Sequence, residues 1–299
     1  MAKKRKKTKQ TVKRNYKARL FEMIFQNKRE LLELYNAVNE TDYRNPEELE
    51  INTLENAIYL SMHNDISFII DSRLSLYEHQ STYSPNLPLR YLMYVSDLYS
   101  KMTSDSNLYG TKVVTVPPPK FLIFYNGADE RPEMEEMKLS DAYAIDDPDP
   151  SLELKAVMLN INPGNNELLM SACKTLKDYV EYTSRVRDYA EIMGLEDAVE
   201  QAITECISEG ILTDFLTKSR AEAKKMSIYE YDEQRQRRFD REEGREEGRE
   251  EGREEGRKEG EERLVNLAQI LLKNNDHDAL KKVVNDKKYR EKLYVKYNL

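Results

Sequence analysis

The sequence predicts an α/β fold in which helices flank a mixed sheet and a helical extension follows towards the C-terminal end. Three observations support this prediction. Short strand-like runs gather before residue 80, two aliphatic-aromatic runs at 120–125 and 152–161 follow a helical stretch, and the spacing beyond residue 166 is helical. Strand, helix and strand in this order favour a mixed sheet with helices packed on it.

The first predicted helix covers residues 16–38, where apolar positions such as Leu20 and Ile24 recur at three- and four-residue steps. Asn45 and Pro46 then break the chain. Because the fixed φ of proline suits the first helical position, Pro46 is expected to start a short helical turn.

Strand-like runs follow, and prolines introduce the next helix, which is expected near 89–99. The two later core strands end in the turn sequences Asn126-Gly127 and Asn162-Pro163-Gly164. The predicted strands are 57–62, 66–70, 74–78, 120–125 and 152–161.

The chain is expected to divide into five segments of different composition. They are a basic flexible arm (1–15), a sheet-bearing core (16–190), a helical extension (191–240), a repeat segment (241–262) and a small helical segment (263–299). The repeat Glu-Glu-Gly-Arg favours a helix through Glu–Arg pairs three residues apart, but each glycine costs about 1 kcal/mol relative to alanine. A solvated helix, a linker, and a coiled-coil contact in a homo-oligomer all remain open.

Charge is unevenly distributed along the chain, whose net charge is -8. Residues 1–19 hold ten Lys or Arg and no acid, so the arm is either a DNA-phosphate contact without sequence preference or a solubilising tail. The DNA-contact hypothesis names Lys3, Lys4, Arg5, Lys6 and Lys7.

No stretch approaches the roughly 20 apolar residues of a membrane span, and the basic N-terminus lacks the apolar region of a secretion signal. We therefore expect a cytoplasmic protein without membrane contact. Cys173 and Cys206 lack CxxC spacing and are expected as buried free thiols rather than a disulfide or a zinc site.

A polar constellation stands out in the predicted hairpin. If Ser72 and Arg73 form its two-residue turn, the numbers of facing residues add up to 145, so Asp65 faces Gln80. Side chains alternate with period two along a strand, which puts Glu78 on the same face as these two. The opposite face is expected to be a core face and carries Ile66, Phe68, Ile70 and Tyr77.

Two carboxylates on one sheet face are costly unless they are solvated, hydrogen-bonded or bound to a cation. Oxygen ligands of this kind suit Mg²⁺, which is typically held by one or two carboxylates, water and substrate phosphate. Such an ion would activate water and stabilise the leaving oxygen in phosphodiester hydrolysis. The alternative is that Asp65 only starts a strand and that Glu78 lies on a solvated face.

The sequence resembles the bacterial recombination-promoting nuclease and putative transposase family of the PD-(D/E)XK nuclease superfamily. The resemblance rests first on Glu78-His79-Gln80-Ser81-Thr82 with an aspartate thirteen residues before Glu78, and it covers nearly the whole chain after the arm. Further matching segments are 64–68, 88–90, 124–127, 158–162, 206–212 and the Gly-Arg-Glu-Glu tail.

The resemblance implies a restriction-endonuclease-like core at 16–190, with Asp65 and Glu78 as the metal-binding carboxylates of a Mg²⁺-dependent DNA endonuclease linked to recombination or mobile elements. Gln80 stands where the wider superfamily usually has lysine. Glutamine can orient a water by hydrogen bonding, but it cannot act as a cation or exchange a proton. The catalytic set is therefore Asp65, Glu78 and Gln80.

Three further residues lie near this set or could reach it. His79 alternates to the opposite face and is interpreted as a packed histidine. Arg90 either contacts a phosphate or is a surface arginine at a helix start. Glu22 on the first helix is a candidate to complete the metal shell.

Motifs of other common chemistries are missing from the sequence, including the phosphate-binding loop, G-x-G-x-x-G, H-E-x-x-H and G-x-S-x-G. Their absence removes the commonest alternatives, and the resemblance implies a Mg²⁺-dependent DNA endonuclease, which is the function we expect. The main alternative is a non-catalytic protein that retains the fold and binds DNA or another partner. A third hypothesis makes the repeat segment an oligomerisation stalk.

Overall fold

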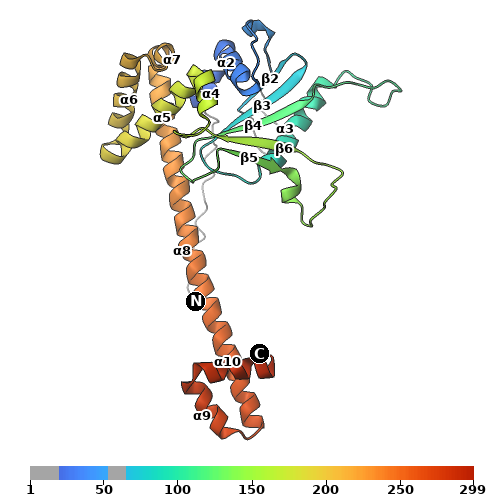
Figure 1. Cartoon of the computed structure of the whole chain (residues 1–299), viewed down its shortest axis with the longest axis vertical. Coiled ribbons are helices and arrows are strands. Elements are labelled where there is room, and N and C mark those ends of the chain that lie inside the picture. Colours follow the sequence, from blue (N-terminus) through green and yellow to red (C-terminus); the bar gives the residue numbers. More distant parts are fainter. Residues whose placement is uncertain (1–19, 53–64) are drawn as a thin grey trace, which may run out of the picture. The chain divides into compact units, whose positions relative to one another are not determined.

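The computed structural model of the chain describes residues 20–52 and 65–299 (Figure 1). Its centre is a six-stranded mixed sheet with helices packed on it, which confirms the α/β class. The sheet order is β1-β2-β3-β4-β6-β5. The strands are β1 (Glu50–Ile51), β2 (Ile66–Ile70), β3 (Arg73–Gln80), β4 (Pro119–Tyr125), β5 (Met134–Lys138) and β6 (Lys155–Asn160).

The central strands of the sheet run parallel, and its outer strands run antiparallel. β3 pairs with β4 and β4 with β6 in parallel, whereas β1–β2, β2–β3 and β5–β6 are antiparallel pairs. Parallel strands need a crossover, and α3 (Leu87–Met102) supplies it between β3 and β4. This arrangement buries the C-terminal end of β3 inside the sheet.

Helices cover both faces of the sheet. On one face, a cluster built on Tyr77 and Phe124 joins the sheet to the helices α1 (Leu20–Phe25), α2 (Lys28–Asn39), α5 (Lys174–Ile192) and α6 (Leu195–Glu209). On the other face, Leu74, Leu76 and Ile123 pack against Tyr91 and other residues of α3. Polar side chains at the end of β3 are thus covered by helices on either face of the sheet.

The first predicted helix is interrupted. Asn27 separates α1 from α2, and its side chain accepts a hydrogen bond from the backbone N of Arg29. An asparagine in this role starts a new helix, because it satisfies a backbone donor that has no partner within the helix. The short turn predicted at Pro46 is confirmed as the 3-10 helix η1 (Pro46–Glu48).

The predicted strands at 66–70, 74–78, 120–125 and 152–161 and the helix near 89–99 are confirmed, with small differences at their ends. The predicted strand at 57–62 lies outside the described residues. The prediction missed β5, a charged edge strand that pairs with β6 only. Its exposed charges hide the strand pattern, and such charges are common on edge strands because they discourage pairing with another chain.

The chain divides into two compact units between Gln234 and Arg235. Beyond α5 and α6, the first unit contains the short helices α4 (Glu167–Ala172) and α7 (Thr213–Lys218). Helix α8 (Arg220–Lys273) begins inside the predicted extension and continues without a break through the whole repeat, so the repeat is helical. A Cβ added at any repeat glycine, for example Gly256, would meet no atom within 4 Å.

The second unit ends in a small helical module. The helices α9 (His277–Asn285) and α10 (Lys287–Tyr297) pack on the end of α8. Their shared core is Leu267, Leu271, Ala279, Val283, Leu293 and Tyr294.

Cys173 and Cys206 are buried free thiols, as predicted. Among the helices of the described ranges, none is both long enough and apolar enough to cross a membrane.

Candidate active site

The hairpin that carries the site turns at Asp71 and Ser72, both of which have positive φ (47° and 58°) as in a type I′ turn. The predicted turn at Ser72 and Arg73 is wrong. A short polar residue such as aspartate enters the left-handed region more readily than arginine does, which favours the turn one residue earlier. In the observed register Ile66 pairs with Tyr77.

The register differs from the predicted one by two residues. Facing numbers add up to 143 instead of 145, so the extended register sets Asp65 opposite Glu78 and not Gln80. Because the side-chain period of a strand is two, a shift of two residues leaves every side chain on its predicted face. The expected grouping of Asp65, Glu78 and Gln80 therefore survives an incorrect turn.

Asp65 and Glu78 are in direct contact. The backbone N of Asp65 lies 3.4 Å from Glu78 Oε2, and the backbone N of His79 donates to Asp65 Oδ2 at 2.6 Å. Only 5% of Asp65 and 1% of Glu78 are exposed. The alternative in which Glu78 lies on a solvated sheet face is thus wrong, since α3 covers that face.

Gln80 lies at the end of β3 and completes the group. Its Nε2 donates to Glu78 Oε1 at 3.2 Å, and its side chain is buried. The backbone N of Asn126, just beyond β4, donates to the carbonyl of Gln80 at 3.0 Å. The parallel ladder with β4 therefore holds the backbone that carries Gln80.

Arg90 on α3 points at the same carboxylate. Its Nη2 donates to Glu78 Oε1 and, at 2.9 Å, to the hydroxyl of Tyr94, which also accepts from Nε at 3.2 Å. Arg90 lies near the start of α3, as the helix-start alternative expects, and 30% of its side chain is exposed, but its charged end is ion-paired with Glu78 instead of extending into solvent. Burial alone would lower the pKa of Arg90, but Glu78, Tyr94 and Asp65 outweigh it and raise the pKa above its ordinary value.

Helix α3 is fixed against the sheet close to this ion pair. The hydroxyl of Tyr91 donates to the backbone carbonyl of Leu122 on β4 at 2.6 Å. Burial, followed by the charges of Glu78 and Asp65, raises the pKa of Tyr91 well above its ordinary value. Tyr91 thus remains a neutral hydrogen-bond donor. Because it fixes α3 against β4, it also fixes the backbone position of the neighbouring Arg90.

His79 occupies the opposite face of β3, as predicted. Its ring stacks on Phe21 with centroids 5.2 Å apart, and its Nε2 lies 2.9 Å from the hydroxyl of Tyr179. That hydroxyl also accepts from Asn126 Nδ2 at 3.3 Å. The strand end that carries Glu78 and Gln80 is therefore tied to α5 through a chain of polar contacts.

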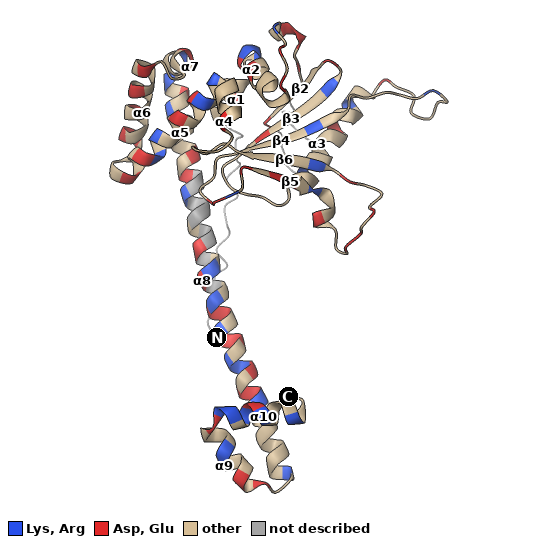
Figure 2. Cartoon of the chain, viewed as in Figure 1, with Lys and Arg blue, Asp and Glu red and all other residues tan. Residues whose placement is uncertain are grey.

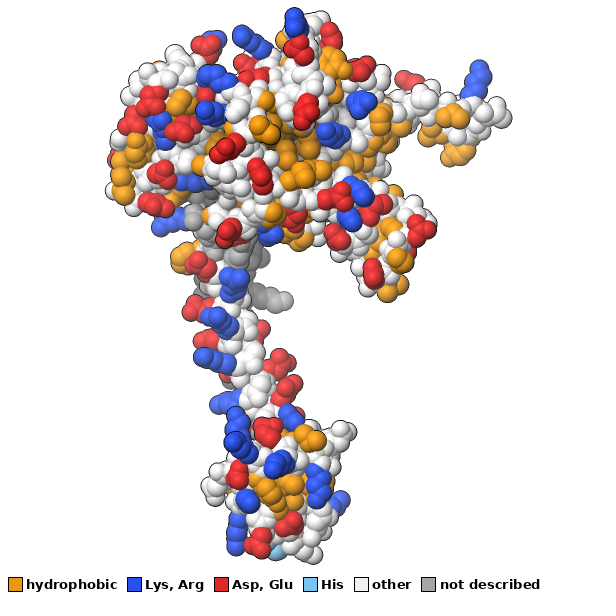
Figure 3. All heavy atoms as spheres, viewed as in Figure 1, with side chains coloured by type: hydrophobic (Ala, Val, Ile, Leu, Met, Phe, Trp, Pro, Cys, Tyr) orange, Lys and Arg blue, Asp and Glu red, His pale blue; other side chains and the backbone are white. Residues whose placement is uncertain are grey.

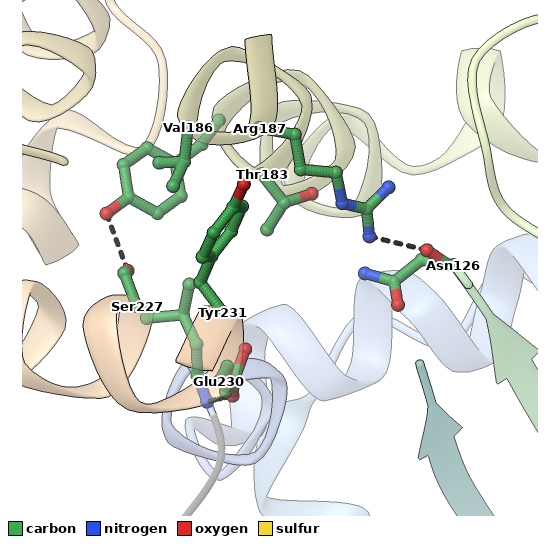
Figure 4. Close-up of a pocket in the computed structure, with 9 residues that line it drawn as sticks. Asn126, Thr183, Val186, Arg187, Ser227, Glu230 and Tyr231 are labelled. Atoms are coloured by element: carbon green, nitrogen blue, oxygen red, sulfur yellow. Dashed lines mark hydrogen bonds between the residues drawn. The ribbon is translucent and has the colours of Figure 1, made fainter. Parts of the chain in front are cut away.

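Arg187 extends this chain on α5. Figure 4 shows its guanidinium directed at the backbone carbonyl of Asn126, and the contact is a hydrogen bond. Its Nη1 also donates to Asn162 Oδ1 at 3.3 Å. The small pocket in Figure 4, lined also by Thr183 and Tyr231, lies beside this support and contains none of the catalytic candidates.

Sequence patterns did not reveal Tyr94, Tyr179, Asn126 or Arg187 as parts of the site's support. Arg90 and Tyr94 could have been found as a pair, since residues four apart are neighbours on a helix. The others are brought together across 53 to 100 positions of sequence and carry no local signal.

The donor set fits Mg²⁺ by kind. Carboxylate and amide oxygens of Asp65, Glu78 and Gln80 are the hard oxygen ligands that Mg²⁺ prefers, and it commonly uses only one or two carboxylates. In the described part of the chain, no group of three or more His, Cys, Asp or Glu side chains is arranged to hold a metal. Glu22 is buried, and its Oε1 accepts from Gln26 Nε2 at 3.0 Å.

Asp65 Oδ2 and both carboxylate oxygens of Glu78 already accept hydrogen bonds. A cation at Glu78 Oε1 would have to share that oxygen with Arg90 and Gln80, or displace them. Water and phosphate would have to supply the remaining ligands.

The arm residues Lys3, Lys4, Arg5, Lys6 and Lys7 lie outside the described residues, so their predicted DNA contact stays a prediction. Comparison with known proteins adds no assignment, because no family model, curated protein or solved structure matches this chain.

Proposed function

We propose that this chain is a Mg²⁺-dependent DNA endonuclease with a restriction-endonuclease-like core and with Asp65, Glu78 and Gln80 at its active site. The observation that carries the proposal is the buried contact between Asp65 and Glu78 at the end of a central strand. Burying two neighbouring carboxylates costs free energy, and proteins accept that cost mainly where charge has a function.

In phosphodiester hydrolysis, each of these three residues would have a separate role. Asp65 and Glu78 would hold the Mg²⁺, which when bound supplies Lewis acidity to the phosphate and to the attacking water. The amide of Gln80, hydrogen-bonded to Glu78 Oε1, would orient that water but cannot supply a charge.

Arg90 supplies the positive charge that Gln80 lacks. Its guanidinium donates a hydrogen bond to Glu78 and remains cationic. It can therefore donate to a phosphate oxygen instead once the Glu78 carboxylate binds the metal. The guanidinium of arginine is planar, and its paired N–H donors match the spacing of phosphate oxygens. A cation from α3 would then replace the lysine that superfamily members usually carry at the position of Gln80.

The competing function is binding without turnover, and one observation favours it. Arg90 and Gln80 together satisfy Glu78 without any metal, as in a purely structural polar cluster. Such a protein would retain the fold and bind DNA or another partner.

Plasmid cleavage with and without Mg²⁺ separates the two functions. Wild type should nick supercoiled plasmid only with the metal, and Asp65→Asn should abolish nicking because it removes a metal-binding charge while preserving the size of the side chain. The matched control is Asp105→Asn, at an exposed position. Equal nicking by all three proteins would indicate a contaminant, and no nicking by a folded wild type would favour the binding protein.

A further inference from the structure

The C-terminal module carries a second concentration of positive charge. Residues 263–299 contain nine Lys or Arg and four Asp or Glu, a net charge of +5. Residues 20–262 contain 28 basic and 51 acidic residues, a net charge of -23. The sequence is thus basic at both ends, and the C-terminal end, unlike the arm, lies in the described part of the structure.

Two of the four acids in this module have structural roles. Asp276 accepts a hydrogen bond from the backbone N of Ala279 at the start of α9, and Asp286 accepts from the backbone N of Tyr289 at the start of α10. Capping aspartates lie at helix N-termini, where they satisfy free backbone donors. Of the other two acids, Asp278 lies on α9, and Glu291 is the one acid within α10, where four lysines are exposed.

Lys288, Lys292 and Lys296 form a row along α10. They are four residues apart, so they follow one another on neighbouring turns at a rise of about 6 Å along the axis. All three side chains are exposed, whereas Leu293 and Tyr294 point into the module core. Figure 2 marks the Lys and Arg positions along the helices of this module, and Figure 3 shows Lys and Arg side chains on its surface.

The charges of this row are not neutralised within the described structure, where no carboxylate lies within ion-pair distance of the three lysines. Other cations of the module have local partners: Arg263 lies over the ring of Tyr294, and Arg290 donates to the carbonyl of Val283. Lys296 contacts only the ring face of Tyr297, at 5.2 Å, which leaves its charge available.

We propose that the row Lys288–Lys292–Lys296 binds the phosphate backbone of duplex DNA. Regularly spaced lysines without a carboxylate partner match the regularly spaced phosphates of DNA. Their binding gains free energy because it releases counterions from the DNA. The contact would not depend on base sequence, because phosphates carry no sequence information. This binding site is independent of the proposed nuclease activity.

A membrane surface fits this face less well. Helices that lie in a membrane interface present bulky apolar residues such as Trp, Phe and Leu towards the lipid. The exposed face of α10 has one apolar side chain, Val295, which is 84% exposed between two of the lysines. Charge, rather than apolar area, dominates the surface.

The test is DNA affinity of the full chain as a function of salt, measured by fluorescence anisotropy of a labelled duplex in EDTA so that no cleavage occurs. The first variant combines Lys288→Gln, Lys292→Gln and Lys296→Gln. The matched control combines Lys177→Gln, Lys218→Gln and Lys225→Gln, three exposed lysines of the first unit that remove the same net charge.

The α10 variant should bind at least about tenfold more weakly at low salt. Its slope of log affinity against log salt should fall by about 2 to 3, since each lost phosphate contact removes about 0.9. The control should change neither quantity by a comparable amount. A third variant that combines Lys288→Arg, Lys292→Arg and Lys296→Arg keeps the charges and should keep the wild-type slope.

Circular dichroism of each variant verifies folding. An unchanged slope in the folded glutamine variant would overturn the proposal, and so would equal losses in the α10 and control variants. Phosphatidylglycerol vesicles are the second probe. Loss of vesicle binding with unchanged DNA binding would assign the row to lipid and would also overturn the proposal.

Discussion

Arg90 on α3 and Glu78 on β3 form an ion pair, with the guanidinium donating to the same oxygen that Gln80 contacts. Glu78 is almost fully buried, and Arg90 brings a cation that stays charged to the edge of the site. The pair offsets part of the cost of burying the Glu78 charge. It also sets up a competition, because Mg²⁺ and Arg90 would use the same carboxylate.

Arg90→Gln should tighten metal binding and weaken cleavage at the same time. Without the guanidinium, one fewer group competes with Mg²⁺ for Glu78 Oε1. We therefore expect the affinity for Mg²⁺ to rise about tenfold, the equivalent of about 1.4 kcal/mol. Cleavage at saturating metal should fall, because the cation that we propose contacts the phosphate is lost. Calorimetric titration with Mg²⁺ and plasmid nicking measure the two effects separately.

Arg44→Gln is the matched control, because Arg44 forms an exposed ion pair with Asp42 outside the site. Arg90→Lys should retain part of the cleavage, since it keeps the charge but loses the paired donors. Unchanged metal affinity in a folded Arg90→Gln protein would show that the arginine does not compete for Glu78.

Gln80→Lys should maintain or raise cleavage, because it places an ammonium beside the proposed scissile phosphate, where charge is most effective once water is excluded. Gln80→Leu should lower cleavage, since it loses the hydrogen bond to Glu78 and the polar group that orients water. Because the new lysine would repel the metal, both variants should be assayed across a Mg²⁺ titration. Equal activity of both variants and wild type at saturating metal would exclude a chemical role for position 80.

Deleting residues 1–14 should weaken DNA binding and reduce its salt dependence, because eight basic residues are lost. Cleavage in a single turnover at saturating protein should change little, since the site residues remain. Anisotropy titrations over a range of salt measure the slope. A slope equal to that of the full chain would remove the arm from DNA binding.

Gly127→Ala should destabilise the first unit and disturb the site. A Cβ at this position would lie 2.5 Å from the hydroxyl oxygen of Tyr125 and 2.6 Å from the carbonyl oxygen of Ser81, so the backbone beside Gln80 would have to move. We expect a loss of about 1–3 kcal/mol, the usual cost of overpacking. Denaturant unfolding followed by circular dichroism measures it.

Gly256→Ala provides the contrast, because the space around Gly256 is open and alanine favours helix by about 1 kcal/mol. This variant should stabilise α8 or leave it unchanged. A Gly127→Ala protein as stable as wild type would mean that the turn after β4 adapts without cost.

Local patterns predicted most of the elements and the grouping of the site. Period-two alternation along β3 was enough to put Glu78 and Gln80 on one face and His79 on the other. The turn was predicted one residue too late, but the resulting error of two residues in register preserves the face of every side chain. The edge strand β5 was missed because its charged side chains break the apolar pattern.

The α/β class, the buried thiols and the shared face of Asp65, Glu78 and Gln80 could be predicted from the sequence, because each depends on periodicity or residue type over a few neighbouring positions. The cover of this face by α3 and the ion pair between Arg90 and Glu78 could be seen only in the folded chain. The same holds for the contacts of Tyr179 with Asn126 and His79, which are far from it in sequence. Such contacts follow from how whole helix and sheet faces pack to fill space, and packing at that range leaves no local trace in the order of residues.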